Sequence, residues 1–266
     1  MKGKIKKIIF VSMFAIAATT LWYLKLELLT TVVAEEKKPD VKKILDSVDR
    51  LYRSNHSFAT MEMRIETPDW KRTLEMNVWA LGLEKTFIRI LSPQKDKGIA
   101  TLRIKNEMWN FFPKIDKSMK VPPSMMMGSW MGSDFTNDDL VKESTFIKDY
   151  DSKLIDYQFK NKDNNYYYIE LRPKEKTATV WEKIIVVIKK DNFNPLRQEY
   201  YDDKDVKVRE IIFKDVKTFG NKTIPSVMEL TPLNKIGHKT IIEYKDLKFD
   251  KVDESIFSHV NLQKRI

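Results

Sequence analysis

The sequence predicts a mainly β protein with a few helices. In this fold, a curved antiparallel sheet of about eleven strands forms an incomplete β-barrel that is closed by helices and a Met-rich loop. Three observations predict it. Short segments alternate apolar and polar residues with a period of two along most of the chain. Clusters of Pro, Gly, Asn and Asp separate these segments. One long segment near residue 45 has the apolar spacing of a helix.

The helical segment begins at Asp40, a residue type that caps helix N-termini. Ile44, Leu45 and Val48 then recur at helical spacing, and the pattern ends after Tyr52. Because one face is continuously apolar, we expect this helix to cover the concave side of the sheet.

The strand segments are short and spaced as in an antiparallel sheet with one face exposed to water. Turn residues such as Gly82 and the pair Pro68-Asp69 separate them. A short helical turn is expected over 252–257. The expected strands are 59–65, 74–80, 85–90, 99–104, 108–112, 154–160, 166–171, 180–189, 195–201, 206–213, 223–230 and 240–249.

A central stretch from Pro113 to Leu140 interrupts the strands. Five of the 12 methionines fall in it, and three prolines and two glycines prevent a single regular element. Near its end, Thr136 and Asp139 have the spacing of a capping box, which predicts a short helix after Thr136.

Composition excludes several kinds of site. The chain of 266 residues has no cysteine, so it has no disulfide, thiolate metal site or catalytic cysteine. The 48 basic and 38 acidic residues give a net charge of +10, of which +4 lies in the first 34 residues, where five lysines accompany Glu27. The remaining surplus of +6 fits contact with an anionic membrane surface, and it equally fits a role in solubility alone.

The N-terminus has the pattern of an export signal. Four lysines between Lys2 and Lys7 precede an apolar run from Ile8 to Leu24, and small residues end at Ala34. Residues 1–34 are therefore either a cleaved signal peptide or a retained N-terminal anchor, since about 17 apolar residues reach the lower limit for a membrane span. In both cases residues 35–266 are expected to form a single domain outside the cytoplasm.

The sequence has no recognisable catalytic, metal or cofactor motif. His56, His238 and His259 lack metal-ligand spacing, and Gly128-Ser-Trp-Met-Gly132 is not a G-x-S-x-G nucleophile elbow. Asp134, Asp138 and Asp139 could bind a cation, but helix-capping and first-turn positions explain them better. Glycine-rich phosphate loops and nucleic-acid motifs are also missing from the sequence. We therefore expect no enzyme, no cofactor and no nucleic-acid partner.

The distinctive chemistry is apolar and adaptable. Methionine is flexible and polarisable, which suits a surface that accepts apolar partners of variable shape. The alternative is that the methionine side chains of the central stretch fill an ordinary core. The prolines and glycines that interrupt regular structure there favour a lid over a ligand instead. Lys114, Lys117 and Lys120 lie beside them, either to meet lipid phosphates or to keep the loop solvated. The candidate lipid-binding and lid residues are Trp109, Phe111, Met119, Met125, Met126, Met127, Trp130, Met131 and Phe135.

Several motifs resemble those of the LolA-like outer membrane lipoprotein-sorting protein family. Phe87-x-Arg89-x-x-x-Pro93 and Trp109-x-Phe111-x-Pro113 are similar to its paired strand motifs. Met131-Gly-Ser-Asp-Phe135, followed by Asp138-Asp139-Leu140, is similar to a subgroup of the family, and the spacing of aromatic residues from Tyr244 to Phe257 also fits. The resemblance covers nearly the whole of residues 35–266.

The resemblance implies a periplasmic carrier that shelters the acyl chains of lipoproteins or other lipids and delivers them toward the outer membrane. Its expected partners are an inner-membrane exporter and an outer-membrane acceptor. The alternative on the same scaffold is a lipoprotein-sensing regulator, and a lipid hydrolase is less favoured. Where LolA proper has the Arg-Pro that latches its lid, this chain has Leu81 to Lys85, so Arg89 is the candidate latch.

Overall fold

The computed structural model describes residues 39–142, 146–155, 165–177 and 179–266. The predicted signal or anchor at 1–34 lies outside the described residues, as does most of the strand expected at 154–160. Residues 40–266 form one compact unit. Among the described residues, none of the helices has the length and apolar character needed to cross a membrane.

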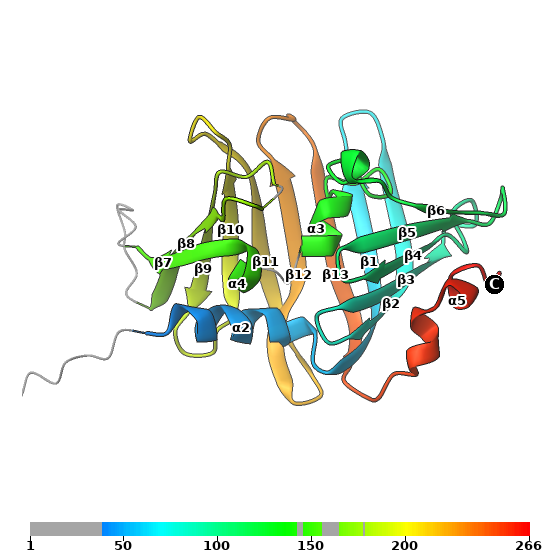
Figure 1. Ribbon diagram of the computed structural model, residues 1–266, viewed down its shortest axis with the longest axis horizontal. Helices are drawn as coiled ribbons and strands as arrows, with labels where there is room; N and C mark the ends of the chain where they lie inside the picture. Colours follow the sequence, from blue (N-terminus) through cyan, green and yellow to red (C-terminus); the bar gives the residue numbers. More distant parts are fainter. Residues whose placement is uncertain (1–38, 143–145, 156–164, 178) are drawn as a thin grey trace, which may run out of the picture. The chain divides into compact units, whose positions relative to one another are not determined.

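The unit is built on one antiparallel sheet of 13 strands in the order β6-β5-β4-β3-β2-β1-β13-β12-β11-β10-β9-β8-β7 (Figure 1). The sheet is not closed, because β6 and β7 are its two edges. This confirms the predicted mainly β fold with a curved antiparallel sheet that does not close into a barrel, and the sheet has 13 strands where the sequence predicts about eleven. The strands are β1 (His56–Glu66), β2 (Lys71–Leu81), β3 (Lys85–Ser92), β4 (Ala100–Ile104), β5 (Glu107–Phe112), β6 (Lys117–Lys120), β7 (Tyr150–Leu154), β8 (Tyr166–Pro173), β9 (Lys183–Lys189), β10 (Pro195–Tyr201), β11 (Lys207–Phe219), β12 (Lys222–Pro232) and β13 (Lys239–Lys248).

Helices cover both faces of the sheet. Figure 1 shows α2, α3 and α4 across one face, which we call the inner face, while α5 lies beside β2 to β4. The side chains of Val252, Phe257 and Leu262 pack against the opposite, outer face of β3 to β5. The helices are α2 (Val41–Tyr52), η1 (Pro123–Met125), α3 (Asn137–Lys142), α4 (Phe146–Asp149), η2 (Glu254–Phe257) and α5 (His259–Leu262).

The expected first helix is confirmed. The carboxylate of Asp40 accepts hydrogen bonds from the backbone N–H groups of Lys42 and Lys43, so it caps α2. Ile44, Leu45 and Val48 are buried against the sheet, as their helical spacing predicts.

The period-two alternation is also confirmed in most strands. In β1, Met61, Met63 and Ile65 are buried while the residues between them are half-buried. In β3 and β4, however, both faces are buried. The expectation of one wet face is therefore wrong for these two strands, because the C-terminal η2 and α5 cover their outer face. It is also wrong for β9, in which Ile184 to Ile188 are all buried.

Candidate functional site

An apolar cavity of about 170 Å³ lies between the inner face of the sheet and the elements that cover it. Its floor comes from strands at both ends of the chain, and its cover comes from α2, α3, α4 and the central stretch. The lining residues are Val48, Asp49, Tyr52, Arg53, Ser57, Ala59, Met61, Met76, Val78, Ala80, Thr86, Ile88, Thr101, Arg103, Trp130, Phe135, Asp138, Asp139, Leu140, Phe146, Tyr150, Trp181, Ile184, Pro195, Gln198, Tyr200, Ile211, Phe213, Met228, Ile242, Tyr244 and Leu247.

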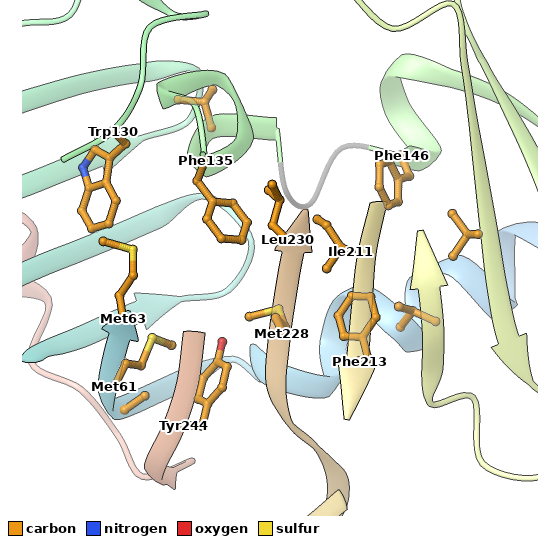
Figure 2. Close-up of a cluster of buried hydrophobic side chains, with 14 of the residues drawn as sticks. Met61, Met63, Trp130, Phe135, Phe146, Ile211, Phe213, Met228, Leu230 and Tyr244 are labelled. Carbon is orange, nitrogen blue, oxygen red and sulfur yellow. The ribbon is translucent and has the colours of Figure 1, made fainter. Parts of the chain in front are cut away.

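The floor of the cavity contains three methionines that belong to strands. Met61 lies on β1, Met76 on β2 and Met228 on β12, and Met61 is the cross-strand partner of Met76. Figure 2 shows Met61 and Met228 together with Phe213 and Tyr244 in the buried cluster. Unbranched thioether side chains adapt to the shape of a neighbour, so this floor can fit apolar molecules of different shapes.

The C-terminal end of α2 forms one wall of the cavity. The ring of Tyr52 stacks on the ring of Tyr244 with 5.0 Å between centroids. Its hydroxyl donates a hydrogen bond of 2.8 Å to the carbonyl of Pro225. Both contacts hold the end of α2 against β12 and β13, so this wall is fixed by polar as well as apolar contacts.

Trp130 and Phe135 bring the central stretch onto the cavity. Trp130 is only 3% exposed, and its indole Nε1–H donates to the hydroxyl of Thr101 at 3.1 Å. That hydroxyl is also 2.7 Å from the side-chain oxygen of Asn110. Figure 2 shows the rings of Trp130 and Phe135 above the strands. The indole hydrogen bond fixes the ring orientation, because a buried indole N–H needs an acceptor.

Hydrogen bonds to backbone carbonyls order the methionine-rich loop. The side-chain amide of Asn137 donates to the carbonyls of Met125 and Gly128 at 3.1 and 3.2 Å. The backbone N–H of Trp130 bonds to the carbonyl of Phe135 at 2.8 Å. The stretch is therefore a folded loop with defined contacts.

The predicted capping box at the start of α3 is confirmed. The hydroxyl of Thr136 accepts from the backbone N–H of Asp139 at 3.1 Å, and the Asp139 carboxylate accepts from the N–H of Thr136 at 2.7 Å. The same carboxylate binds the guanidinium of Arg209 on β11 through two hydrogen bonds of 2.6 and 2.8 Å. One acidic side chain thus begins α3 and also ties it to the sheet.

Burial and the neighbouring charge of Arg209 have opposite effects on the pKa of Asp139. Burial by itself would raise the pKa of Asp139, but the charge and hydrogen bonds of Arg209, with the bonds from Thr136, hold it below its ordinary value. The guanidinium also lies over the rings of Tyr200 and Trp181, at 4.0 and 4.4 Å from their centroids. Burial raises the pKa of Tyr200, so its hydroxyl stays neutral.

The predicted site residues separate into groups. Trp130 and Phe135 line the cavity. Met126 and Met131 pack against the same core, whereas Met119, Met125 and Met127 are exposed. Trp109 and Phe111 belong to the outer-face cluster under η2 and α5 and do not line the cavity.

Arg89, the candidate latch, is buried on the outer side of β3. Its guanidinium donates hydrogen bonds to the carbonyls of Gly98, Asn261 and Lys264 and lies 5.0 Å from the ring centroid of Phe87. Burial lowers its pKa. These contacts bind the C-terminal segment to the sheet, and the central stretch is not among its hydrogen-bond partners in the described part of the chain.

The three histidines lie apart from one another, and of the candidate cation ligands Asp134 lies 3.6 Å from His238, between carboxylate oxygen and Nδ1. His56 begins β1, His238 lies in the turn before β13 and His259 lies on α5. Across the described ranges, no group of His, Asp and Glu side chains is placed to hold a metal ion. The hydroxyl of Ser129 donates to the carbonyl of Ser133.

The sequence reasoning missed the strand methionines and the polar groups of the cavity. Met61 and Met76 lie in segments with period-two alternation, but alternation does not distinguish a cavity wall from a filled core. Arg103 lines the cavity and donates to the carbonyl of Val141 in α3 at 3.4 Å. An arginine at an inward-facing strand position was the available signal.

A family model described as "Uncharacterized protein" matches residues 82–264. No curated protein matches the sequence. Several solved structures share the fold. A DUF1329 family protein from Desulfovibrio piger has a TM-score of 0.75 at 20% identity, with 83% of this chain and 97% of the other covered.

Two further solved structures are similar. An outer membrane lipoprotein-sorting protein domain from Vibrio parahaemolyticus has a TM-score of 0.72 at 24% identity and covers 84% of this chain and 98% of its own. A LolA superfamily protein from Nitrosomonas europaea has a TM-score of 0.69 at 19% identity, with 83% and 98% covered. At these identities the likeness concerns the fold.

Proposed function

Because the chain belongs to the family of uncharacterized proteins whose model matches residues 82–264 and has a LolA-like fold, we propose that it is a periplasmic lipid carrier. Its cavity shelters the acyl chains of lipoproteins or other lipids and delivers them toward the outer membrane. The observation that carries this proposal is the apolar cavity between the inner face of the sheet and its helical cover.

The size and lining of the cavity support an acyl ligand. Dry apolar cavities of about 150 Å³ bind small hydrocarbons such as benzene, and this cavity of about 170 Å³ is similar. Each methylene group removed from water contributes about 0.8 kcal/mol. The methionine side chains of the floor can move aside, so a longer chain can enlarge the space that it enters.

The cover is the part that must move to admit a ligand. α3 is only six residues long, and its ties to the sheet include the Asp139–Arg209 pair and the bond from Arg103 to the carbonyl of Val141. The central stretch, with Trp130 and Phe135, is the lid in this proposal. Release of α3 from Arg209 would expose the cavity without disturbing the strands.

Carrier activity also requires a donor and an acceptor. We place an inner-membrane exporter before this protein and an outer-membrane acceptor after it. Movement of an intact lipid from one binding site to another needs no covalent step. The protein accordingly needs only an apolar site, a movable cover and surfaces for its partners.

The proposal is tested by filling the cavity from within. Ala59 and Ala80 line it from neighbouring strands, so the double change Ala59→Leu/Ala80→Leu occupies the space with apolar atoms. Delipidated wild-type protein should bind a fluorescent long-chain acyl probe at one site per chain. The filled variant should bind it at least tenfold more weakly and remain as stable as the wild type.

Thr60→Leu is the matched control, because it places the same side chain one residue along β1 on the other face. It should leave probe binding unchanged. If the filled variant binds the long-chain probe as tightly as the wild type, the cavity is not the acyl site.

A further inference from the structure

Three segments that are distant in the sequence meet at the end of the sheet near α5: residues 93–98, 113–117 and 264–266. A Cβ atom on Gly98 would lie 3.3 Å from Pro113 and 3.9 Å from Ile266, and the φ of +85° at this position favours glycine. Asp116 is 3.0 Å from Arg265. Figure 1 shows the turn that joins β5 to β6 on the same side as α5 and the C-terminus.

These segments present a concentrated positive charge. Six basic side chains are exposed there, and we call them the basic patch: Lys95, Lys97, Lys114, Lys117, Lys264 and Arg265. Of the two acidic residues in the same segments, Asp96 is buried and paired with Arg72 at 2.6 Å. Within the described residues, Arg265 alone among the six has an acidic partner, Asp116. The patch therefore carries a net positive charge toward solvent.

Two large apolar side chains are exposed within the basic patch. Ile115 is 65% exposed at the tip of the β5–β6 turn, between Lys114 and Lys117. Ile266 is 58% exposed beside Arg265. An isoleucine surrounded by lysines is suited to an interface that is anionic at its surface and apolar just beneath, as the headgroup region of a bilayer is.

We propose that the basic patch, with Ile115 and Ile266, docks the protein on an anionic lipid bilayer. Basic side chains bind the lipid phosphates, and the two isoleucines enter the boundary between headgroups and acyl chains. Nucleic acid would present phosphates as well, but the three segments contain no aromatic residue on which bases could stack. The patch shares no residue with the cavity lining, so docking goes beyond the carrier function and does not depend on cargo.

The test uses a fluorophore at the tip of the patch. Because the chain has no cysteine, Ile115→Cys gives one labelling site in the full chain. The apolar run at 8–24 could bind vesicles by itself, so the readout is the burial of position 115 in the bilayer and not total binding. An environment-sensitive dye at 115 should shift its emission to the blue with vesicles that contain phosphatidylglycerol, and not with phosphatidylcholine alone.

Charge reversal should remove this shift. Each basic residue near an anionic surface changes affinity roughly fivefold. Lys114→Glu/Lys117→Glu should therefore raise the lipid concentration needed for a half-maximal shift by at least roughly 25-fold. High salt should have the same effect, because it screens exposed charges.

Two matched variants control for position and net charge. A dye at Ile236→Cys probes an isoleucine that is 93% exposed but lies in the β12–β13 turn. Lys204→Glu/Lys235→Glu changes net charge equally at exposed lysines outside the patch. The proposal predicts no shift at 236 and a normal shift at 115 in the second variant.

Four results would overturn the proposal: equal shifts at 115 and 236, a shift without anionic lipid, a shift that survives the Lys114→Glu/Lys117→Glu change, or no shift with any vesicle. All substituted side chains are exposed, and thermal unfolding of each variant checks that the fold is intact.

Discussion

The carboxylate of Asp139 and the guanidinium of Arg209 form a bidentate pair between α3 and the sheet, with hydrogen bonds of 2.6 and 2.8 Å. Asp139 lies in the first turn of α3, and Arg209 lies on β11. Both residues are largely removed from water, and the rings of Trp181 and Tyr200 flank the guanidinium. This ion pair thus joins α3, which belongs to the cover of the cavity, to strand β11 of the sheet.

Removal of one partner of this pair should destabilise the protein strongly. A buried charge left without its partner costs about 3–5 kcal/mol. We expect Arg209→Met and Asp139→Asn each to lower the free energy of unfolding by an amount in this range, measured by urea denaturation. The double variant should lose less than the sum of the two, because it leaves no unpaired charge.

Arg172→Ala is the control, since Arg172 forms an ion pair with Glu182 in which both side chains are about half exposed to solvent. Exposed pairs contribute about 0–1 kcal/mol. Additive losses in the double variant would show that Asp139 and Arg209 do not stabilise the fold as a pair.

Stability should fall in acid partly through Glu243 on β13. Hydrogen bonds from Lys245 and Arg64, acting against partial burial, lower the pKa of Glu243 from 4.5 to about 2. A carboxyl group whose pKa is lower in the folded state stabilises the fold above its unfolded pKa and loses this effect as pH falls. The contribution should therefore be complete above about pH 5 and disappear between pH 4.5 and about 2.

The comparison of wild type and Glu243→Gln in urea at several pH values isolates this effect. The difference in unfolding free energy should be largest near pH 7 and approach zero near pH 2. A constant difference across this range would mean that protonation of Glu243 is not linked to folding.

Two adjacent methionines offer a test of the lid. Both residues belong to the central stretch. Met126 packs against the core, whereas Met125 is 61% exposed. We expect Met126→Asp to weaken acyl-probe binding roughly tenfold, because a carboxylate at this core contact must lose its hydration and would therefore displace the lid from the cavity. Met125→Asp adds the same charge one residue earlier and should leave binding unchanged.

Trp130→Asp should weaken binding as Met126→Asp does, and far-UV circular dichroism checks that both variants remain folded. Equal affinities for the wild type, Met126→Asp and Trp130→Asp would exclude the central stretch from the binding site.

Local periodicity predicts the strands and their facing but not the cavity. Alternation places Met61 and Met63 on the same face of β1, and both are buried there. Only Met61 lines the cavity, because that depends on where α2 and α3 cross the sheet. Trp109 and Phe111 likewise share one face of β5. This face is the outer one, where the C-terminal helices cover it, and the local pattern does not show that.

The central stretch shows the same limit. Its prolines and glycines predict an irregular loop, but Lys117–Lys120 forms β6 because β5 offers an unpaired edge. The capping box was predictable because its hydrogen bonds join residues three apart. The Asp139–Arg209 pair joins residues 70 positions apart, so no local pattern contains it.

A reversible covalent bond between the lid and the sheet should trap the bound ligand. The backbone N–H of Asp134 in the central stretch donates to the hydroxyl of Thr240 on β13 at 3.0 Å, and that hydroxyl donates to the Asp134 carboxylate at 2.8 Å. Because the two side chains are in direct contact, cysteines at positions 134 and 240 are placed to be tested as a disulfide pair. In Asp134→Cys/Thr240→Cys loaded with an acyl probe, oxidation should slow release at least tenfold, and reduction should restore the rate. The single variants control for each substitution, and a release rate that oxidation does not alter would mean that the ligand leaves without movement of the central stretch away from β13.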